Sequence, residues 1–306
     1  ASQVATTTPI EGIPTSPAGG APLGPNIPPI KKPRDPMTAG MVMKLIGSLL
    51  IVAVIFFGSF LAYIAFNPEQ AGFFINMLGI DPKDIPACDV ILISHSHFDH
   101  LNLSSIEFLA EKNNKAALIF PEDCENYMPQ FDLDMIRLKN DNGYERKIIG
   151  DSVTVNGVKI TTVFAQHWGG RYGFDGYLWG DNAFTGYIIQ YNGLTVYFAG
   201  DTGYDPLKFK QISERYNIDL ALIPIGPCAD CKQCGTYNHV FPPDAYSIFR
   251  DLDAKWMVPI HYGTLHFAQA NPMEPVIAFR EIVKENKAEE KIPILEIGEQ
   301  KIFLKK

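Results

Sequence analysis

One long apolar run dominates the hydrophobicity pattern of this chain. Leu45 to Phe66 spans 22 residues without a charged side chain, and a helix needs about 20 apolar residues to cross the hydrocarbon core of a bilayer. The run is apolar on every face, unlike a surface helix, which keeps one polar side. The pattern therefore predicts a membrane anchor over residues 41–66. A buried core helix or the apolar part of a signal peptide would produce a similar run.

The residues before the run set the expected membrane topology and the first domain boundary. Basic side chains precede it at Lys31, Lys32, Arg34 and Lys44, which places the N-terminus in the cytoplasm and the following domain across the membrane. Residues 1–40 are rich in Pro, Gly, Thr and Ser and have no hydrophobic periodicity. Such a segment cannot bury enough apolar surface to offset the entropy of ordering, so we expect a disordered tail.

Residues 67–306 have the pattern of a globular domain. Short β-branched runs predict strands at 90–94, 117–120, 158–164, 187–190, 194–199, 220–223, 256–260 and 294–297. Amphipathic stretches predict helices near 104–112, 205–216, 243–253 and 273–287. Strands interleaved with helices predict an α/β layered fold.

A dense group of metal-binding side chains follows the first of these strands. The string His95-Ser-His-Phe-Asp-His100 contains three imidazoles and the carboxylate of Asp99. These groups are ligands that suit zinc, iron and manganese. A single histidine would be explained as a hydrogen-bonded surface or core residue, but four such side chains directly after an apolar strand are harder to explain in that way. We predict ligands at His95, His97, Asp99 and His100.

Further candidate ligands lie at the ends of later strands. His167, Asp201 and His261 each follow a predicted strand, where open α/β sheets keep their binding sites. Neighbouring glycines allow the backbone to approach such a site closely. Five of the seven histidines belong to this set, and His239 is a sixth candidate.

These motifs resemble those of the metallo-β-lactamase superfamily. The later strings narrow the resemblance to phospholipases D that hydrolyse N-acylphosphatidylethanolamine and to their bacterial relatives. Those strings include Gln166-His-Trp-Gly-Gly170, Phe198-Ala-Gly-Asp-Thr-Gly203 and Ile260-His-Tyr-Gly-Thr264. The resemblance covers about residues 79–300 and implies an αββα sandwich.

The resemblance also implies roles for the site residues. It implies two zinc ions per chain, with iron or manganese as alternatives. One ion would be held by His95, His97 and His167, the other by Asp99, His100 and His261, with Asp201 bridging both. Catalytic roles would fall to Asp201, Asp99 and His239. His239 would protonate the leaving group or bind a phosphoryl oxygen, although a supporting or solvent-facing histidine would also fit the sequence.

Two segments depart from the family pattern. Relatives carry several strands before the HxHxDH motif, whereas residues 67–89 hold one apolar run, Phe73–Leu78. We therefore expect the sandwich to lack its early strands and to have an unpaired sheet edge.

The second departure is Cys228-x-x-Cys231-x-x-Cys234. It could bind a metal with His239 or the distant Cys124 as a fourth ligand, contain a disulfide, or form a variable loop beside the pocket, which we favour.

The net charge and the predicted membrane anchor limit the kinds of partner that we expect for this chain. The formal net charge is −8, and the acidic excess lies outside the basic N-terminal segment. Because nucleic-acid binding needs clustered Lys and Arg, we expect no nucleic-acid partner. An anchor beside a hydrolytic site favours a membrane phospholipid as substrate. The oligomeric state is not predicted.

Three functions remain open on the sequence. The leading hypothesis is a zinc phosphodiesterase that converts N-acylphosphatidylethanolamine to phosphatidic acid and N-acylethanolamine. Alternatives are a hydrolase of a soluble ester, lactone or cyclic phosphodiester, because a fold does not determine its substrate, and a membrane-tethered metal-binding scaffold without catalysis. The aromatic stretch Trp168–Trp179 would line a lipid-facing entrance under the first hypothesis and would be an ordinary loop under the others.

Overall fold

The computed structural model describes residues 85–303, except 113–114, 141–145, 264–270 and 297–298. The predicted tail, the anchor at 41–66 and the run Phe73–Leu78 lie outside the described residues. Within these residues, no helix is long and apolar enough to span a membrane. All of them belong to the unit Pro68–Lys306.

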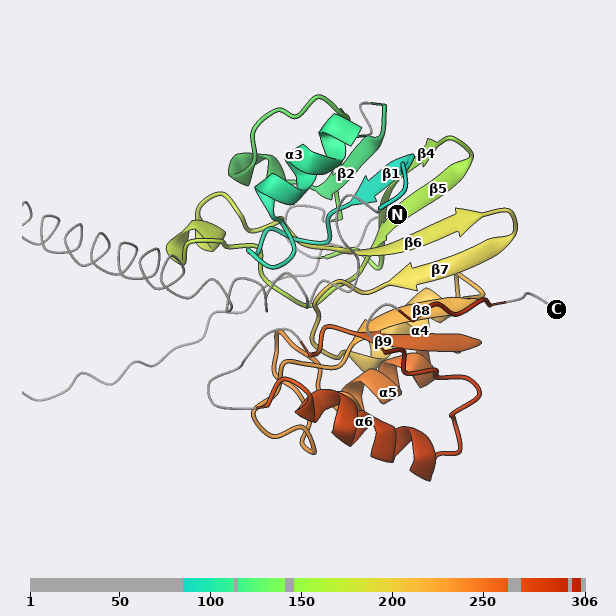
Figure 1. Cartoon of the computed structure of the whole chain (residues 1–306). Coiled ribbons are helices and arrows are strands. Elements are labelled where there is room, and N and C mark those ends of the chain that lie inside the picture. The colour runs from blue at the N-terminus through green and yellow to red at the C-terminus, as the bar shows by residue number, and fades with distance from the viewer. Residues whose placement is uncertain (1–84, 113–114, 141–145, 264–270, 297–298, 304–306) are drawn as a thin grey trace, which may run out of the picture. The chain divides into compact units, whose positions relative to one another are not determined.

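Two sheets form the centre of the domain (Figure 1). The smaller sheet is parallel, in the order β1-β2-β3, and consists of Val90–Leu92, Ala117–Pro121 and Asp134–Leu138. The larger sheet has the order β4-β5-β6-β7-β8-β9. Its strands are Ile149–Val155, Val158–Val163, Gly186–Tyr191, Leu194–Phe198, Leu220–Pro224 and Trp256–Ile260.

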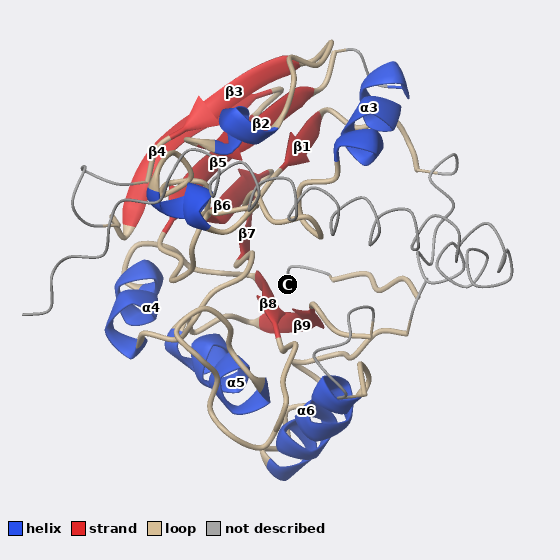
Figure 2. Ribbon diagram, turned by 90° about the vertical axis from the view of Figure 1, so that its left-hand side faces the viewer, coloured by secondary structure: helices blue, strands red, loops and turns tan. Residues whose placement is uncertain are grey.

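Helices cover the outer faces of both sheets (Figure 2). Helix α3 (Leu103–Lys112) packs on the smaller sheet through a cluster that includes Ile106 and Leu118. The helices α4 (Pro206–Ser213), α5 (Pro242–Asp251) and α6 (Glu274–Glu285) cover the larger sheet. Two short 3₁₀ helices, η2 (Cys124–Tyr127) and η3 (Phe174–Tyr177), lie in the loops. The layers therefore follow the predicted helix–sheet–sheet–helix order.

Local sequence explains the antiparallel part of the larger sheet. Asn156-Gly157 joins β4 to β5, and Asn192-Gly193 joins β6 to β7. All four residues have positive φ angles, between 48° and 82°. A two-residue hairpin turn of this kind requires that conformation, and Asn-Gly adopts it readily. From β7 onward the strands are parallel, and α4 and α5 form the crossovers.

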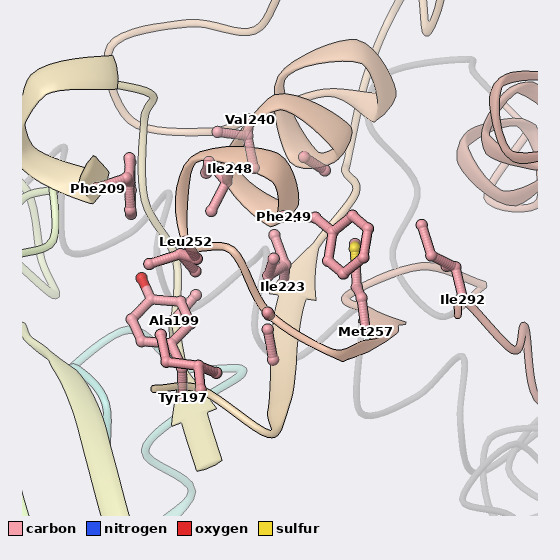
Figure 3. Packing of buried hydrophobic residues seen from close by; sticks show 14 of the residues in the cluster. Tyr197, Ala199, Phe209, Ile223, Val240, Ile248, Phe249, Leu252, Met257 and Ile292 are labelled. Atoms are coloured by element: carbon pink, nitrogen blue, oxygen red, sulfur yellow. The ribbon is translucent and has the colours of Figure 1, made fainter. Parts of the chain in front are cut away.

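The main apolar core lies between the larger sheet and its helices. Figure 3 shows part of it, with Ile248 and Phe249 of α5 among residues of the strands, such as Ile223 and Met257. A second cluster fills the space between the two sheets and includes Ile119, Ile160 and Tyr187. Burial of both faces of the central strands explains their nearly continuous apolar sequences.

The structure corrects the predicted elements at three places. No strand forms at 294–296, the described part of the strand predicted at 294–297. Pro293 precedes this segment and has no N–H to donate to a sheet ladder. Strands β3 and β4 were not predicted. Their half-exposed, mixed sequences lack a clear apolar run, and β4 also has an irregular register with β5.

Candidate metal centre

The HxHxDH motif forms a turn after β1. His95 pairs with Phe184 in an isolated antiparallel bridge, and the amide of Ser96 donates to the carbonyl of Ala183 at 3.1 Å. The turn closes with a hydrogen bond from the Leu101 amide to the His97 carbonyl at 2.8 Å. These backbone contacts place the motif at the end of the smaller sheet and attach it to the chain that leads into β6.

The loops that carry His167 and Asp201 are joined to one another. The Gln166 amide donates to the Thr202 hydroxyl at 2.9 Å, and the Gly203 amide donates to the Gln166 carbonyl at 2.7 Å. Gly203 must be glycine at this crossing, because a Cβ there would lie 2.0 Å from the Tyr237 carbonyl oxygen. The ends of β5 and β7 therefore present their candidate ligands together.

His261 has an unusual backbone conformation. It follows β9 directly and has a φ angle of +62°, which is uncommon for a residue with a side chain. Its Nδ1 lies 2.6 Å from the Gly226 carbonyl oxygen. Such strained conformations occur at functional sites when surrounding contacts enforce them.

All seven predicted ligands converge at one place. Asp201 lies at the centre: its Oδ2 is 3.8 Å from His95 Nε2, 3.4 Å from His100 Nε2 and 3.5 Å from His261 Nε2. The potential ligand atoms of His95, His97 and His167 form one close group, and those of Asp99, His100 and His261 form another. These are the two triads that the resemblance implied.

Hydrogen bonds orient the histidines toward this centre. His167 Nδ1 donates to the Asn238 carbonyl at 2.8 Å, and His261 Nδ1 donates to the Gly226 carbonyl. In each ring a proton is therefore on Nδ1, and Nε2 faces the cluster. The Nε2 of His261 lies 3.4 Å from Asp99 Oδ2. Backbone carbonyls commonly fix metal-binding histidines in this way.

The pKa shifts divide the histidines into two sets. Burial lowers the pKa of His167 to about 3 and also lowers the pKa values of His95 and His97. Burial lowers the pKa of His100 too, but hydrogen bonds to Asp201 and Asp99 outweigh it and raise the pKa to about 9. His95, His97 and His167 are thus neutral at pH 7, as metal ligands must be.

Several buried polar atoms of the cluster have no hydrogen-bond partner. They include His95 Nε2, His97 Nε2 and Asp201 Oδ1. A buried polar atom without a partner costs free energy, so these atoms require a ligand that the protein itself does not provide. A divalent cation fits, because imidazole nitrogens and carboxylate oxygens surround the same small volume. The His/Asp cluster is therefore consistent with metal binding, while the individual ligand roles and the identity of the metal stay predictions.

His239 lies at the edge of the same cluster. Its Nδ1 is 3.6 Å from Asp201 Oδ2, and its side chain is 30% exposed. With His167 and Asp201 it forms a third group of close potential ligand atoms. This position allows it to face a bound substrate, so its predicted contact with the leaving group remains a hypothesis compatible with the geometry.

The cysteine loop contains a disulfide between Cys228 and Cys231. The interpretation of this segment as a variable loop beside the pocket is incomplete, because two of its cysteines are bonded. Cys124, considered as a fourth metal ligand, is buried elsewhere and lies near the Ala183 carbonyl. Among the described residues, no group of potential metal ligands includes a cysteine.

Sequence analysis missed several residues that support the site. Arg171 donates to the Ser96 carbonyl at 2.5 Å, and its guanidinium lies 4.1 Å from the centre of the Phe98 ring. Asp175 holds the surrounding loop by accepting hydrogen bonds from the amides of Arg171 and Tyr172. Arg171 follows His167 closely in the sequence, and this position was the signal that could have identified it as a residue of the site. The carbonyls of Gly226 and Asn238 give no side-chain signal.

Comparison with known proteins identifies the class. The Beta-lactamase superfamily domain matches residues 70–262. The metallohydrolase Igni18 of Ignicoccus hospitalis shares the fold, with a TM-score of 0.52 and 24% identity, over 74% of this chain and 84% of that protein. The likeness to Igni18 shows the fold, and the family match covers more than half of the chain, so the chain belongs to the metallo-β-lactamase superfamily. With the His/Asp cluster, the family match defines a metal-dependent hydrolase.

Two curated relatives refine this similarity. The chain is 27% identical to a mitochondrial N-acyl-phosphatidylethanolamine-hydrolyzing phospholipase D of Saccharomyces cerevisiae, over 72% of the chain and 45% of that protein. It is 31% identical to a UPF0173 metal-dependent hydrolase of Nanoarchaeum equitans, over 65% of the chain and 82% of that protein. The chain thus spans about half the length of the yeast phospholipase and most of the length of the archaeal hydrolase.

Proposed function

We propose that this chain is a membrane-anchored, zinc-dependent phosphodiesterase of the phospholipase D type. Its substrate is an N-acylphosphatidylethanolamine, and its products are phosphatidic acid and an N-acylethanolamine. The observation that carries the lipid substrate is an aromatic cavity beside the His/Asp cluster. The similarity to the yeast phospholipase supports the same proposal.

The cavity has a volume of about 620 Å³ and a mainly aromatic wall. Its lining residues are Trp168, Tyr172, Gly173, Phe174, Tyr177, Asp181, Tyr237 and Asn238. Two of them contact the cluster: the Trp168 ring lies 5.1 Å from the His97 ring, and the Asn238 carbonyl accepts the hydrogen bond from His167. A molecule in this cavity would therefore lie beside the residues that contact the candidate metal ligands.

The cavity wall exposes large aromatic side chains to solvent. Tyr172, Phe174 and Tyr177 are 72%, 85% and 81% exposed. Asp175 keeps their loop ordered through three hydrogen bonds, including one from the Tyr127 hydroxyl at 2.7 Å. Clustered aromatic residues of this kind favour the interface between water and hydrocarbon. The proposed anchor at 41–66 would keep the chain at the membrane that contains its lipid substrate.

The chemistry of the reaction follows from the cluster. Bound zinc would supply the charge that stabilises a phosphodiester transition state and lowers the pKa of a water molecule toward neutrality. His95, His97 and His167 would bind one ion and Asp99, His100 and His261 the other. Asp201, with an oxygen close to both triads, would bind both. His239, half-buried at the edge, would contact the phosphoryl oxygen or the leaving group.

Product analysis tests this proposal. The full chain is purified in detergent, loaded with zinc and given N-acylphosphatidylethanolamine, and the products are identified by mass spectrometry. We expect phosphatidic acid and N-acylethanolamine from the native chain and a loss of at least about 100-fold in His97→Ala, the size of effect when a group that stabilises the transition state is removed. Lys159→Ala, at an exposed position of β5, serves as the matched control and should retain activity.

A soluble substrate is the second candidate. The archaeal relative, which the chain matches over most of that protein's length, is named only as a metal-dependent hydrolase. A parallel assay with a water-soluble phosphodiester and a lactone separates the two functions. In the double variant Phe174→Ser/Tyr177→Ser, the proposal predicts a slower reaction with lipid vesicles and an unchanged rate with soluble esters. Turnover of soluble esters alone would favour the second candidate, and two bound zinc ions without any turnover would favour a scaffold.

A further inference from the structure

A single loop provides the hydrogen-bond acceptors for two candidate ligands. Residues 225–241 connect β8 to α5. Near the start of this loop the Gly226 carbonyl accepts from His261, at 2.6 Å, and near its end the Asn238 carbonyl accepts from His167, at 2.8 Å. A displacement of either carbonyl would change the orientation of a metal-binding ring.

The Cys228–Cys231 disulfide lies two residues after the first of these carbonyls. Both cysteines are buried, with exposed fractions of 2% and 0%. They pack with Ala278 of α6 and with Phe241 in a small apolar cluster. Cys231 also lines a separate cavity of about 400 Å³ between the loop, α5 and α6. The bond therefore borders this cavity, and a small reagent reaches the fully buried Cys231 when the loop opens locally.

The two halves of the loop are anchored differently. In the second half, Val240 donates to the Thr202 carbonyl at 2.8 Å, and the amide of Gly235 donates to the Asp244 carboxylate. In the first half, Lys232 and Gln233 donate to Asp230 within the loop itself. The ion pair from Lys232 to α6 joins exposed side chains at 3.9 Å, and such pairs contribute little. Directly before Gly226, the Ile225 amide donates to the Ile260 carbonyl at 3.0 Å. The buried disulfide is therefore the cross-link that holds the chain directly after Gly226.

We propose that Cys228–Cys231 is a site of thiol–disulfide exchange with a dithiol reductant, and that its redox state sets the affinity of the metal position that includes His261. This inference rests on the metal centre of the proposed function. Reduction removes the cross-link that follows Gly226 and allows the Gly226–Pro227 segment to shift relative to His261, while the Ile225 amide stays bonded to the Ile260 carbonyl. The Asn238 carbonyl keeps its position because Val240 and Gly235 anchor it independently. The triad of His95, His97 and His167 should therefore retain its affinity.

The exchange proceeds in two balanced steps. A thiolate of the dithiol attacks Cys231 Sγ from the cavity, the Cys228–Cys231 bond breaks, and Cys228 leaves as a thiolate and takes up a proton. The second thiolate of the reductant then attacks its own sulfur in the mixed disulfide. Cys231 is released and protonated, and the reductant departs as a cyclic disulfide. Two electrons pass from the dithiol to the cysteine pair.

The third cysteine of the loop provides an internal control. Cys234 is exposed, and the negative charge of Asp244 raises its pKa. Its thiol is therefore a poor nucleophile at neutral pH. Cys234→Ser should change neither the disulfide nor the metal affinity, whereas Cys228→Ser/Cys231→Ser should reproduce the reduced state permanently.

The experiment uses the full zinc-loaded chain. One portion is treated with dithiothreitol under nitrogen and desalted, so that the reductant cannot chelate the metal during measurement. Iodoacetamide labelling and mass spectrometry count the thiols, and competition with a chromophoric chelator measures both zinc affinities. We expect two additional labelled thiols after reduction and an affinity about tenfold lower at one of two zinc positions. This loss is at the lower end of that caused by removing the hydrogen-bond partner of a metal-binding histidine.

Four results would overturn the inference. Both affinities could remain unchanged although the two thiols become labelled, which would show that the disulfide does not act on the metal. All the loop cysteines could be labelled before reduction, which would show that no disulfide exists. Zinc could bind more tightly after reduction, which would indicate a thiolate metal site instead. If the oxidised chain bound fewer than two zinc ions, the proposed two-metal centre would be wrong. The proposed effect of the disulfide on the metal affinity would then be wrong as well. The native chain supplies these readouts even if the double variant does not fold.

Discussion

At the scale of single residues, the site depends on groups that are not themselves candidate ligands. Asp175 is buried in the loop that exposes the aromatic wall, and its carboxylate accepts from two amides and one phenol. Arg171 belongs to the same loop and donates to the carbonyl of Ser96, between the first two histidines of the motif. The position of the metal-binding turn and the shape of the cavity are therefore linked through a few hydrogen bonds.

Removal of the Asp175 carboxylate should loosen this loop. Asp175→Ala leaves three donors without their acceptor, and we expect the free energy of unfolding to fall by about 1–3 kcal/mol. Denaturant titration and limited proteolysis near Arg171 measure the effect. Asp181→Ala, at an exposed position of the same loop, should stay within about 0.5 kcal/mol of the native chain. Equal losses in both variants would contradict the role of Asp175.

The contribution of Asp175 should also depend on pH. Burial raises its pKa, but hydrogen bonds from Arg171, Tyr127 and Tyr172 outweigh this effect and lower the pKa below the ordinary value of 3.8. Because the pKa is lower in the folded state, the stabilisation is fully present above pH 3.8 and is lost as the pH falls through the folded-state pKa. The difference in unfolding free energy between the native chain and Asp175→Asn should be constant from pH 7 to about 5 and shrink below about pH 4. A difference that grows in acid would contradict this assignment.

At the scale of elements, the two sheets are joined by buried contacts near the site. The Tyr187 hydroxyl on β6 donates to the Ile93 carbonyl, just after β1, at 2.8 Å. Ile93 is two residues before His95, so this bond connects the larger sheet to the strand that delivers the motif. Tyr197 on the neighbouring strand β7 is equally buried, but its hydroxyl has no hydrogen-bond partner.

The two tyrosines should respond in opposite ways to the same substitution. Tyr187→Phe leaves the Ile93 carbonyl unpaired, and we expect a loss of about 1–2 kcal/mol in the free energy of unfolding. Tyr197→Phe removes a buried hydroxyl that already lacks a partner, so we expect no loss or a gain of up to about 1 kcal/mol. Urea titrations of both variants compare the effects. Destabilisation by Tyr197→Phe as large as that by Tyr187→Phe would show that the hydrogen bond is unimportant.

At the scale of the whole molecule, the candidate metal ligands come from both sheets and from four separate loops. The chain segments around residues 95–100, 167, 201 and 261 meet only in the folded domain. A cation bound at this junction stabilises the folded state relative to the unfolded one, because the unfolded chain does not preserve the site.

Metal removal should therefore lower thermal stability. A bound ion at 100 times its Kd stabilises the fold by about 2.7 kcal/mol, which corresponds to a Tm shift of about 5–10 °C for a domain of this size. Dialysis against a chelator followed by scanning calorimetry measures the loss, and added zinc should restore it. His97→Ala should show a smaller response to zinc. An identical Tm with and without zinc would contradict a metal centre in this cluster.

Much of the domain could be predicted from local sequence. The apolar runs of β2, β5 and β6 are mostly buried and mark strands directly, and the seven ligand candidates combine residue type with position at strand ends. Strands β3 and β4 escaped prediction because their side chains are only partly buried, so their sequences keep polar residues. The Asn156-Gly157 turn could have revealed β4, since it requires a strand on each side.

The sequence by itself determined the layered α/β class, the HxHxDH turn and the set of possible metal ligands, because hydrophobic periodicity and ligand chemistry are local properties. Only the tertiary structure decided which atoms meet. It brought Asp201 to the centre of the histidines, oriented His167 and His261 through backbone carbonyls of one loop, and paired Cys228 with Cys231. The contacts of the site join segments far apart in the chain or involve backbone groups that every residue carries, so no sequence pattern distinguishes them before the chain folds. For the neighbouring cysteines, the sequence left a metal site, a disulfide and a plain loop open, and only the folded loop shows which two sulfurs meet.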